Sequence, residues 1–264
     1  MTKTLLIAVT TTHPHLHQQA KELASELGLD FVINTQASHY LYLLALTPEY
    51  LAVISKGKTS PFYIDFLSNK MLTRSDQAGF RSELIARAMG LKPRENPVIV
   101  DATAGLGRDS FVLATLGYQI TMLERSPILN ALLRDALIRA QKITKSAAIV
   151  SNMHLVHTNA IDWLPKHKAD IVYLDPMFPE RKKSASVKKE MVIMQELLGK
   201  DEDVDLLFEA ALTCAKRRVV VKRPRLAANI VERAPNFSIT GKSSRFDIYL
   251  VGNHGPTDAI HFPH

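Results

Sequence analysis

The part of the 264-residue sequence that begins near residue 71 repeats one pattern: a short apolar run, a turn, and a stretch with helical spacing. Parallel neighbouring strands need a crossover connection, and a helix usually supplies it. The chain is therefore expected to adopt an α/β fold with a mostly parallel sheet. The expected strands are 98–101, 119–124, 155–157, 171–174 and 219–222, followed by a hairpin of 237–240 and 246–251.

The first 70 residues have a different pattern, in which short β-rich runs dominate. One helix is expected over 16–27, because apolar residues fall at helical spacing and Gly28 follows. The expected strands are 5–9, 31–34, 40–46, 50–55 and 61–66. These patterns predict a small N-terminal α+β domain, residues 1–70, ahead of an α/β domain, residues 71–264.

Composition excludes several classes of protein. The single cysteine, Cys214, rules out an internal disulfide and a cysteine metal cluster. No apolar run is long enough to span a membrane, and the run 5–9 is too short for the core of a signal peptide. His13, His15 and His17 alternate without a nearby carboxylate, so no metal site is expected. We expect a cytoplasmic protein with no membrane or metal partner.

A glycine-containing loop joins the strand 98–101 to the next expected helix. The loop reads DATAGLGRD from Asp101 to Asp109. Glycine lets the backbone approach a ligand closely, and a helix N-terminus offers unpaired N–H groups. An acid that ends the next strand, as Glu124 does, accepts hydrogen bonds from ribose hydroxyls. The pattern predicts a site for a nucleoside-bearing cofactor formed by Asp101, Gly105, Gly107 and Glu124.

The loop favours S-adenosyl-L-methionine over other nucleoside cofactors. A dinucleotide site needs glycine or alanine where Ser110 stands, and Asp109 would repel a pyrophosphate. No lysine follows the glycines as it does in nucleoside triphosphate sites. S-adenosylmethionine has no phosphate and carries a positive charge, which suits the acid. A tight turn without a ligand is the alternative.

A second loop, DPMFP at residues 175–179, follows the strand 171–174. Ligands of open α/β sheets bind at this end of the strands. The Asp175 carboxylate and the Pro176 carbonyl can accept hydrogen bonds from an exocyclic amino group, and Phe178 can stack on a base. These three residues are the catalytic candidates. The alternative is a simple loop start with Phe178 in the core.

Positive charge is concentrated near this loop. The chain has 33 Lys+Arg and 26 Asp+Glu, a net charge of +7. One basic cluster lies in residues 181–189 and a second in residues 216–225, and both are expected beside the active face, with near balance elsewhere. Such cations can contact RNA phosphates, although solvated faces are the alternative. The candidate RNA contacts are Arg181, Lys182, Lys183, Lys188, Lys189, Lys222, Arg223 and Arg245.

Six motifs together resemble one family. They are DATAGLGRD (101–109), LER (123–125), YLDPMFP (173–179), VKKEM (187–191), VKRP (221–224) and RFDIY (245–249). As a set they are similar to the bacterial 16S ribosomal RNA guanine-N2 methyltransferases that modify guanosine 1516, which are class I S-adenosylmethionine-dependent enzymes. The resemblance spans roughly residues 57–252.

The resemblance implies a Rossmann-like methyltransferase domain with a seven-stranded sheet and a 16S rRNA or 30S subunit substrate. It implies cofactor contacts at Arg108, Asp109, Glu124, Arg125, Asn159, Ala160 and Asp175. Many relatives of the wider class have an acid where Asn159 stands, so Asp162 is the alternative contact to the adenine. The oligomeric state is expected to be a monomer or a weak dimer.

Two other functions fit the same residues. Loops of the Asp-Pro-x-Phe type also serve methyl transfer to the N6 of adenine in DNA or RNA. A non-catalytic RNA-binding factor in ribosome assembly could also have kept the fold. Loss of N6-methyladenine in cells without the protein would favour the first, and absence of cofactor binding would favour the second.

Overall fold

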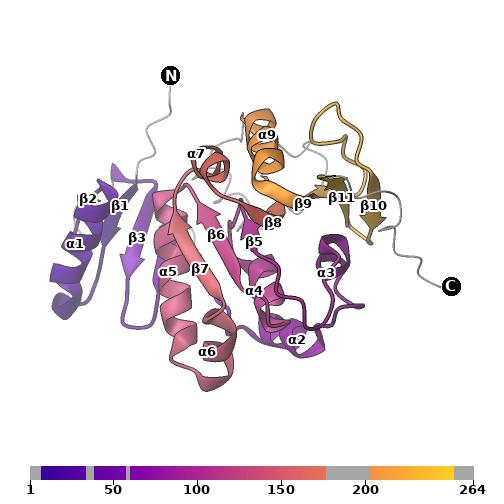
Figure 1. The fold of residues 1–264 in the computed structure, drawn as a ribbon. Coiled ribbons are helices and arrows are strands. Elements are labelled where there is room, and N and C mark those ends of the chain that lie inside the picture. Colours follow the sequence, from indigo (N-terminus) through magenta and orange to yellow (C-terminus); the bar gives the residue numbers. More distant parts are fainter. Residues whose placement is uncertain (1–6, 34–38, 58–59, 177–202, 253–264) are drawn as a thin grey trace.

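The computed structural model describes residues 7–33, 39–57, 60–176 and 203–252, which contain a larger and a smaller sheet (Figure 1). The larger sheet has seven strands in the order β10-β11-β9-β8-β5-β6-β7. β11 runs antiparallel to both of its neighbours, and the other adjacent pairs are parallel. This arrangement confirms the expected α/β class and the seven-stranded, mostly parallel sheet. The strands are β5 (Ile99–Asp101), β6 (Ile120–Glu124), β7 (Met153–His157), β8 (Ala169–Leu174), β9 (Ala215–Pro224), β10 (Phe237–Thr240) and β11 (Ser244–Leu250).

The order of the strands reverses between β5 and β8. From β5 the chain continues outward through β6 and β7, and then returns to place β8 on the other side of β5. At such a switch point the connections leave the sheet in opposite directions, and a crevice opens at the carboxyl ends of the strands. This topology predicts where a ligand binds before any side chain is considered.

Helices cover both faces of the larger sheet, because successive side chains of each buried strand point to opposite faces. Ile99 packs in one core cluster and Val100 in the other. The first cluster includes residues of α3, α4 and α5, and the second includes residues of α7 and α9 (Figure 1). The helices are α2 (Asn69–Gln77), α3 (Leu84–Met89), α4 (Arg108–Thr115), α5 (Pro127–Gln141), α6 (Thr144–Val150), α7 (Ala160–Trp163) and α9 (Val204–Cys214), with a 3-10 turn at Leu164–Lys166.

The helix α5 begins as its sequence predicts. Ser126 is the N-cap and accepts a hydrogen bond from the Leu129 N–H at 3.3 Å, and Pro127 takes the first helical position. Cys214, at the end of α9, is buried in the second core cluster, as expected. In the described part of the chain, no helix is both long and apolar enough to cross a membrane.

The N-terminal residues form a smaller sheet in the order β2-β1-β3-β4. Its elements are β1 (Ile7–Thr10), a 3-10 turn (Pro14–Leu16), α1 (His17–Leu27), β2 (Asp30–Phe31), β3 (Tyr42–Leu46) and β4 (Leu51–Ser55). The strand expected over 61–66 is reduced to one bridge between Phe62 and Val53. Buried residues of this sheet share a core cluster with α5, and Arg134 of α5 forms an ion pair with Glu26 at 2.7 Å.

Candidate active site

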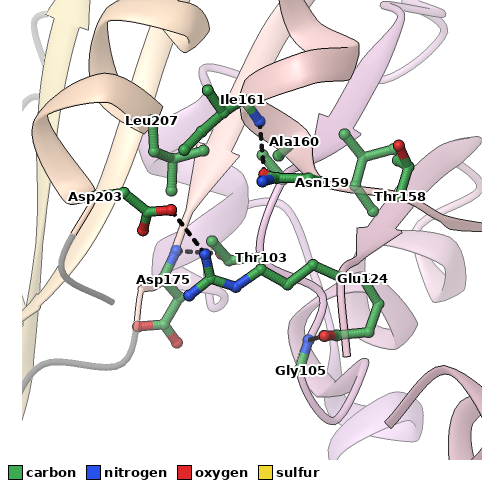
Figure 2. A pocket seen from close by; sticks show the side chains of 13 residues that line it. Thr103, Gly105, Glu124, Thr158, Asn159, Ala160, Ile161, Asp175, Asp203 and Leu207 are labelled. Carbon is green, nitrogen blue, oxygen red and sulfur yellow. Dashed lines mark hydrogen bonds and ion pairs between the residues drawn. The ribbon is translucent and has the colours of Figure 1, made fainter. Parts of the chain in front are cut away.

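A pocket lies in the crevice that the strand order predicts. The carboxyl ends of β5, β6, β7 and β8 all contribute to it, and about 630 Å³ of its volume is free of atoms, part of it open to solvent. Figure 2 shows Asp175 on one side, Gly105 and Glu124 on another, and Asn159 and Ala160 on a third. The lining residues are Ala102, Thr103, Gly105, Leu123, Glu124, Arg125, Thr158, Asn159, Ala160, Ile161, Asp175, Asp203 and Leu207.

Glu124 lines the pocket and is hydrogen-bonded to the glycine loop. Its Oε2 accepts a hydrogen bond from the Gly105 N–H at 3.0 Å, and its Oε1 accepts one from the Ser126 N–H at 2.8 Å. Burial raises the pKa of Glu124 to about 7, although these backbone N–H groups act to lower it. Each carboxylate oxygen has a second lone pair, so a ligand hydroxyl can still be accepted.

Asp101 and Gly107 belong to the glycine loop but do not line the pocket. Asp101 accepts hydrogen bonds from Ser110 Oγ at 2.6 Å and from the Thr103 N–H at 3.1 Å, and burial raises its pKa to about 7. Gly107 caps α4 with a φ of 66°. The structure therefore gives both residues a role in shaping the loop.

The adenine side of the pocket, as the sequence predicts it, contains Asn159 rather than Asp162. Asn159 caps α7, and its Oδ1 accepts a hydrogen bond from the Ile161 N–H at 3.0 Å (Figure 2). Asp162 is exposed and does not line the pocket. Ala160 and Ile161 give this side an apolar wall, and Leu207 of α9 extends it.

Residues far apart in the sequence meet at the pocket, and Asp203 among them lies outside the sequence motifs. Arg125, an expected contact, forms an ion pair with Asp203 at 2.8 Å, and Asp203 precedes α9, 78 residues further along the chain. Thr103 lies in the glycine loop, and its Oγ1 accepts a hydrogen bond from the Asp175 N–H at 2.6 Å. Only the fold brings these residues together, because their positions depend on neighbouring strand ends.

Asp175 follows β8, and its side chain is 40% exposed at the edge of the pocket. Lys222 of β9 donates to Asp175 Oδ2 at 2.9 Å. Burial raises the pKa of Asp175 above its usual range, although Lys222 acts to lower it. Pro176 is buried beside Asp175, and Phe178 lies outside the described residues.

Asp109 lies behind Asp175 and does not line the pocket. Its Oδ2 accepts hydrogen bonds from Lys222 Nζ at 2.7 Å and Tyr173 Oη at 2.8 Å. Arg74 of α2 lies 3.4 Å from Oδ1. Burial would raise the pKa of Asp109, but these donors hold it below its usual range. Arg108 is exposed and lines a separate small depression with Phe66 and Leu106.

The prediction that the second basic cluster, residues 216–225, lies beside the active face is wrong for part of that cluster. Lys216, Arg217 and Arg218 stand at the start of β9, and Lys222 is near its end. Because a strand rises about 3.3 Å per residue, Arg217 is roughly 16 Å from Lys222 along the strand. Arg217 pairs with Glu95, and Arg218 donates to the Ala88 carbonyl. Both residues therefore make these contacts at the end of β9 that is far from the pocket.

Arg223 and Arg245 hold the segment at residues 227–228 in place through its backbone carbonyls. Arg223 donates to the Ala228 carbonyl through Nε at 3.0 Å and Nη2 at 2.8 Å. Arg245 donates to the Ala227 carbonyl at 2.6 Å and pairs with Asp247 at 2.8 Å. The expected RNA contacts Arg181, Lys182, Lys183, Lys188 and Lys189 lie outside the described residues.

Comparison with known proteins decides the family. The family model described as "Putative SAM-dependent methyltransferase" matches residues 22–251. A protein of Thioalkalivibrio sulfidiphilus named Ribosomal RNA small subunit methyltransferase J is 43% identical over 250 residues, which cover 93% of this chain and 98% of that protein. The protein of the same name from Marinobacter nauticus is 47% identical over 88% of this chain and 87% of its own length. The chain belongs to this methyltransferase family.

A solved structure agrees with the family. The S-adenosylmethionine-dependent methyltransferase of Neisseria gonorrhoeae is 31% identical, covers 97% of this chain and all of its own, and superposes with a TM-score of 0.73. The family resemblance of the sequence motifs is thereby confirmed, as are the enzyme class and the cofactor.

The residues of the pocket fit S-adenosylmethionine. Three carboxylates line it, Glu124, Asp175 and Asp203, against one cation, Arg125, which Asp203 already pairs. This excess of acid favours a cationic ligand and disfavours a phosphate. Glu124 would hold the ribose hydroxyls, and the apolar wall beside Asn159 would hold the adenine.

The pKa of Glu124 makes cofactor affinity depend on pH. A carboxyl with a pKa of about 7 is roughly one-tenth ionised at pH 6 and nine-tenths ionised at pH 8. Because the ionised form is the better acceptor for ribose hydroxyls, calorimetry should show S-adenosylmethionine binding that tightens by up to about tenfold between these pH values. Glu124→Gln should bind more weakly with a flat pH dependence; an unchanged slope in that variant would contradict the assignment.

Proposed function

We propose that this chain transfers a methyl group from S-adenosylmethionine to the exocyclic N2 of a guanine in 16S rRNA. The position of Asp175 carries the proposal: an acceptor carboxylate stands at the edge of the cofactor pocket, with its backbone held by Thr103. The names of the curated relatives support a small-subunit rRNA substrate.

In the proposed mechanism, Asp175 and Pro176 orient the amino group. The lone pair of N2 is delocalised into the guanine ring, which makes the nitrogen a poor nucleophile. Hydrogen bonds from the amino group to the Asp175 carboxylate and the Pro176 carbonyl would turn the lone pair out of the ring plane. The cofactor supplies an electrophilic methyl group on a positively charged sulfur. The nitrogen then loses one proton, for which Asp175 is the nearest acceptor.

The target base must leave its stack to reach Asp175. Phe178 would stack on the extruded guanine, which is worth about 1–3 kcal/mol for one base. We assign contacts to RNA phosphates to Arg181, Lys182, Lys183, Lys188 and Lys189, and to Arg223 and Arg245, which hold the segment at residues 227–228. The substrate is 16S rRNA or the 30S subunit.

We assign residues 1–70 to a small supporting domain and residues 71–264 to the domain that carries out methyl transfer. Phe66 of the first part stacks on Phe111 of α4 with ring centroids 5.1 Å apart, close to the glycine loop. We place the protein in the cytoplasm, where its substrate is made, as a monomer or weak dimer.

Transfer from labelled S-adenosylmethionine to naked 16S RNA and to 30S subunits tests the proposal. Nuclease digestion and mass spectrometry of the product should give N2-methylguanosine at a single 16S position. N6-methyladenosine instead would assign the adenine alternative. Cofactor binding without transfer to either substrate would favour the non-catalytic assembly factor.

A further inference from the structure

Lys222 bridges two carboxylates at the edge of the active site. Its Nζ lies 2.9 Å from Asp175 Oδ2 and 2.7 Å from Asp109 Oδ2. We propose that Lys222 is a positioning residue for Asp175: it holds Oδ2 and maintains the carboxylate as an anion, so that Oδ1 is left to accept from the substrate amino group. This inference rests on the proposed function and replaces the expected role of Lys222 as a phosphate contact.

Asp109, which holds the ammonium group of Lys222, is itself held by several neighbouring side chains. Asp109 also accepts from Tyr173 Oη at 2.8 Å and lies 3.4 Å from Arg74, which in turn pairs with Glu83 at 2.9 Å. Tyr173 is buried in β8, two residues before Asp175. Asp109 is thus fixed by α2, α4 and β8, and a fixed Asp109 determines where Lys222 can place its charge.

The local charge argues against a phosphate contact. Lys222 supplies one positive charge, and Asp109 and Asp175 supply two negative charges within hydrogen-bond distance. The group of three therefore has a net charge of −1 when both carboxyls are ionised, which repels a phosphate. Lys222 is also only 28% exposed, so most of the side chain is withdrawn from solvent.

The charged groups around Asp175 explain why it needs this lysine. Burial raises the pKa of Asp175, Asp109 raises it further, and Lys222 and Arg223 of β9 lower it. Asp101 and Tyr173 also interact with Asp175 through their charges, while Arg125 and Asp203 pair with each other across the pocket. Lys222 is the cation in direct contact among the described residues. Without it, Asp175 would bind a proton at higher pH and lose acceptor capacity.

Kinetics of three variants on the rRNA substrate test this role. Lys222→Met should lower kcat at pH 7 by tenfold or more, with the acidic limb of the pH profile displaced to higher pH and with much of the loss regained near pH 9. Lys222→Arg should keep a limb close to that of the wild type. The matched control is Lys216→Met, which changes an exposed lysine near the opposite end of the same strand. A raised KM with unchanged kcat would overturn the proposal and restore the phosphate contact.

A measurement without RNA separates this inference from the proposed function. The carboxyl of Asp175 is followed by carbon NMR in protein with labelled aspartate, and its resonance is assigned by its loss in Asp175→Asn. The pKa of Asp175 should rise by about 1–3 pH units in Lys222→Met and stay near the wild-type value in Lys216→Met. An unchanged pKa in a folded Lys222→Met protein would overturn the positioning role, even if the enzyme methylates guanine as proposed. Failure of the wild type to methylate rRNA would refute the proposed function and leave the titration valid.

Discussion

Asp175→Asn is expected to lower kcat for methyl transfer by about 10²–10³-fold, which is the usual cost of removing one preorganised group that stabilises a transition state. The amide keeps the shape of the side chain, but it presents an NH₂ group where the substrate amino group also donates. The amide also faces Lys222, which lies 2.9 Å from Asp175 Oδ2 in the wild type. Steady-state kinetics with 30S subunits measures the loss.

The control for this prediction is Asp205→Asn, which changes an exposed aspartate in the first turn of α9. It should leave kcat within about twofold of the wild type, since surface changes are usually small. Calorimetry should show that Asp175→Asn still binds S-adenosylmethionine, because Glu124 and the apolar wall are intact. A loss of kcat below tenfold in Asp175→Asn would refute its role as the acceptor.

Gly107→Ala is expected to destabilise the fold strongly. The φ of Gly107 is 66°, and a Cβ built there would lie 3.0 Å from both Leu133 Cδ2 and Phe66 Cζ. The left-handed conformation costs about 1–2 kcal/mol for alanine, and overpacking a buried contact typically costs about 1–3 kcal/mol more. Urea denaturation should therefore show a loss of about 2–5 kcal/mol in the free energy of unfolding.

Gly28 provides a matched control, because its φ is 63° and nothing lies within 4 Å of its Cβ position. Gly28→Ala should lose only the conformational part, about 1–2 kcal/mol. The difference between the two variants measures how tightly the glycine loop packs against the N-terminal residues through Phe66. Equal losses would show that the packing beneath the loop tolerates a methyl group.

The strands of the larger sheet could be predicted because they carry strong local signals. Each expected strand is present, and the N-cap at Ser126 is correct to the residue. The sequence did not indicate α2, whose residues are mostly polar and of which only Met71 and Ser75 are buried. The short helices α3 and α7 also lack the two turns that make helical spacing visible. Such helices depend on tertiary packing.

The lining of the pocket could be predicted where a residue stands at or just after the end of a predicted strand, as Gly105, Glu124 and Asp175 do. Asp203 and Leu207 could not be found, because they reach the pocket from α9 after a long stretch of chain. The carboxylate partners of Lys222 could not be predicted for a similar reason. A lysine near a base-binding loop suggests a phosphate contact, and only the structure places two carboxylates around it.

The most direct test of the central claim is the modification state of 16S rRNA in cells that lack this protein. Mass spectrometry of 16S fragments should show that one N2-methylguanosine disappears, returns with the wild-type gene and does not return with Asp175→Asn. The contradictory result would be 16S rRNA that keeps all of its N2-methylguanosine in the deletion strain, or that loses N6-methyladenosine instead.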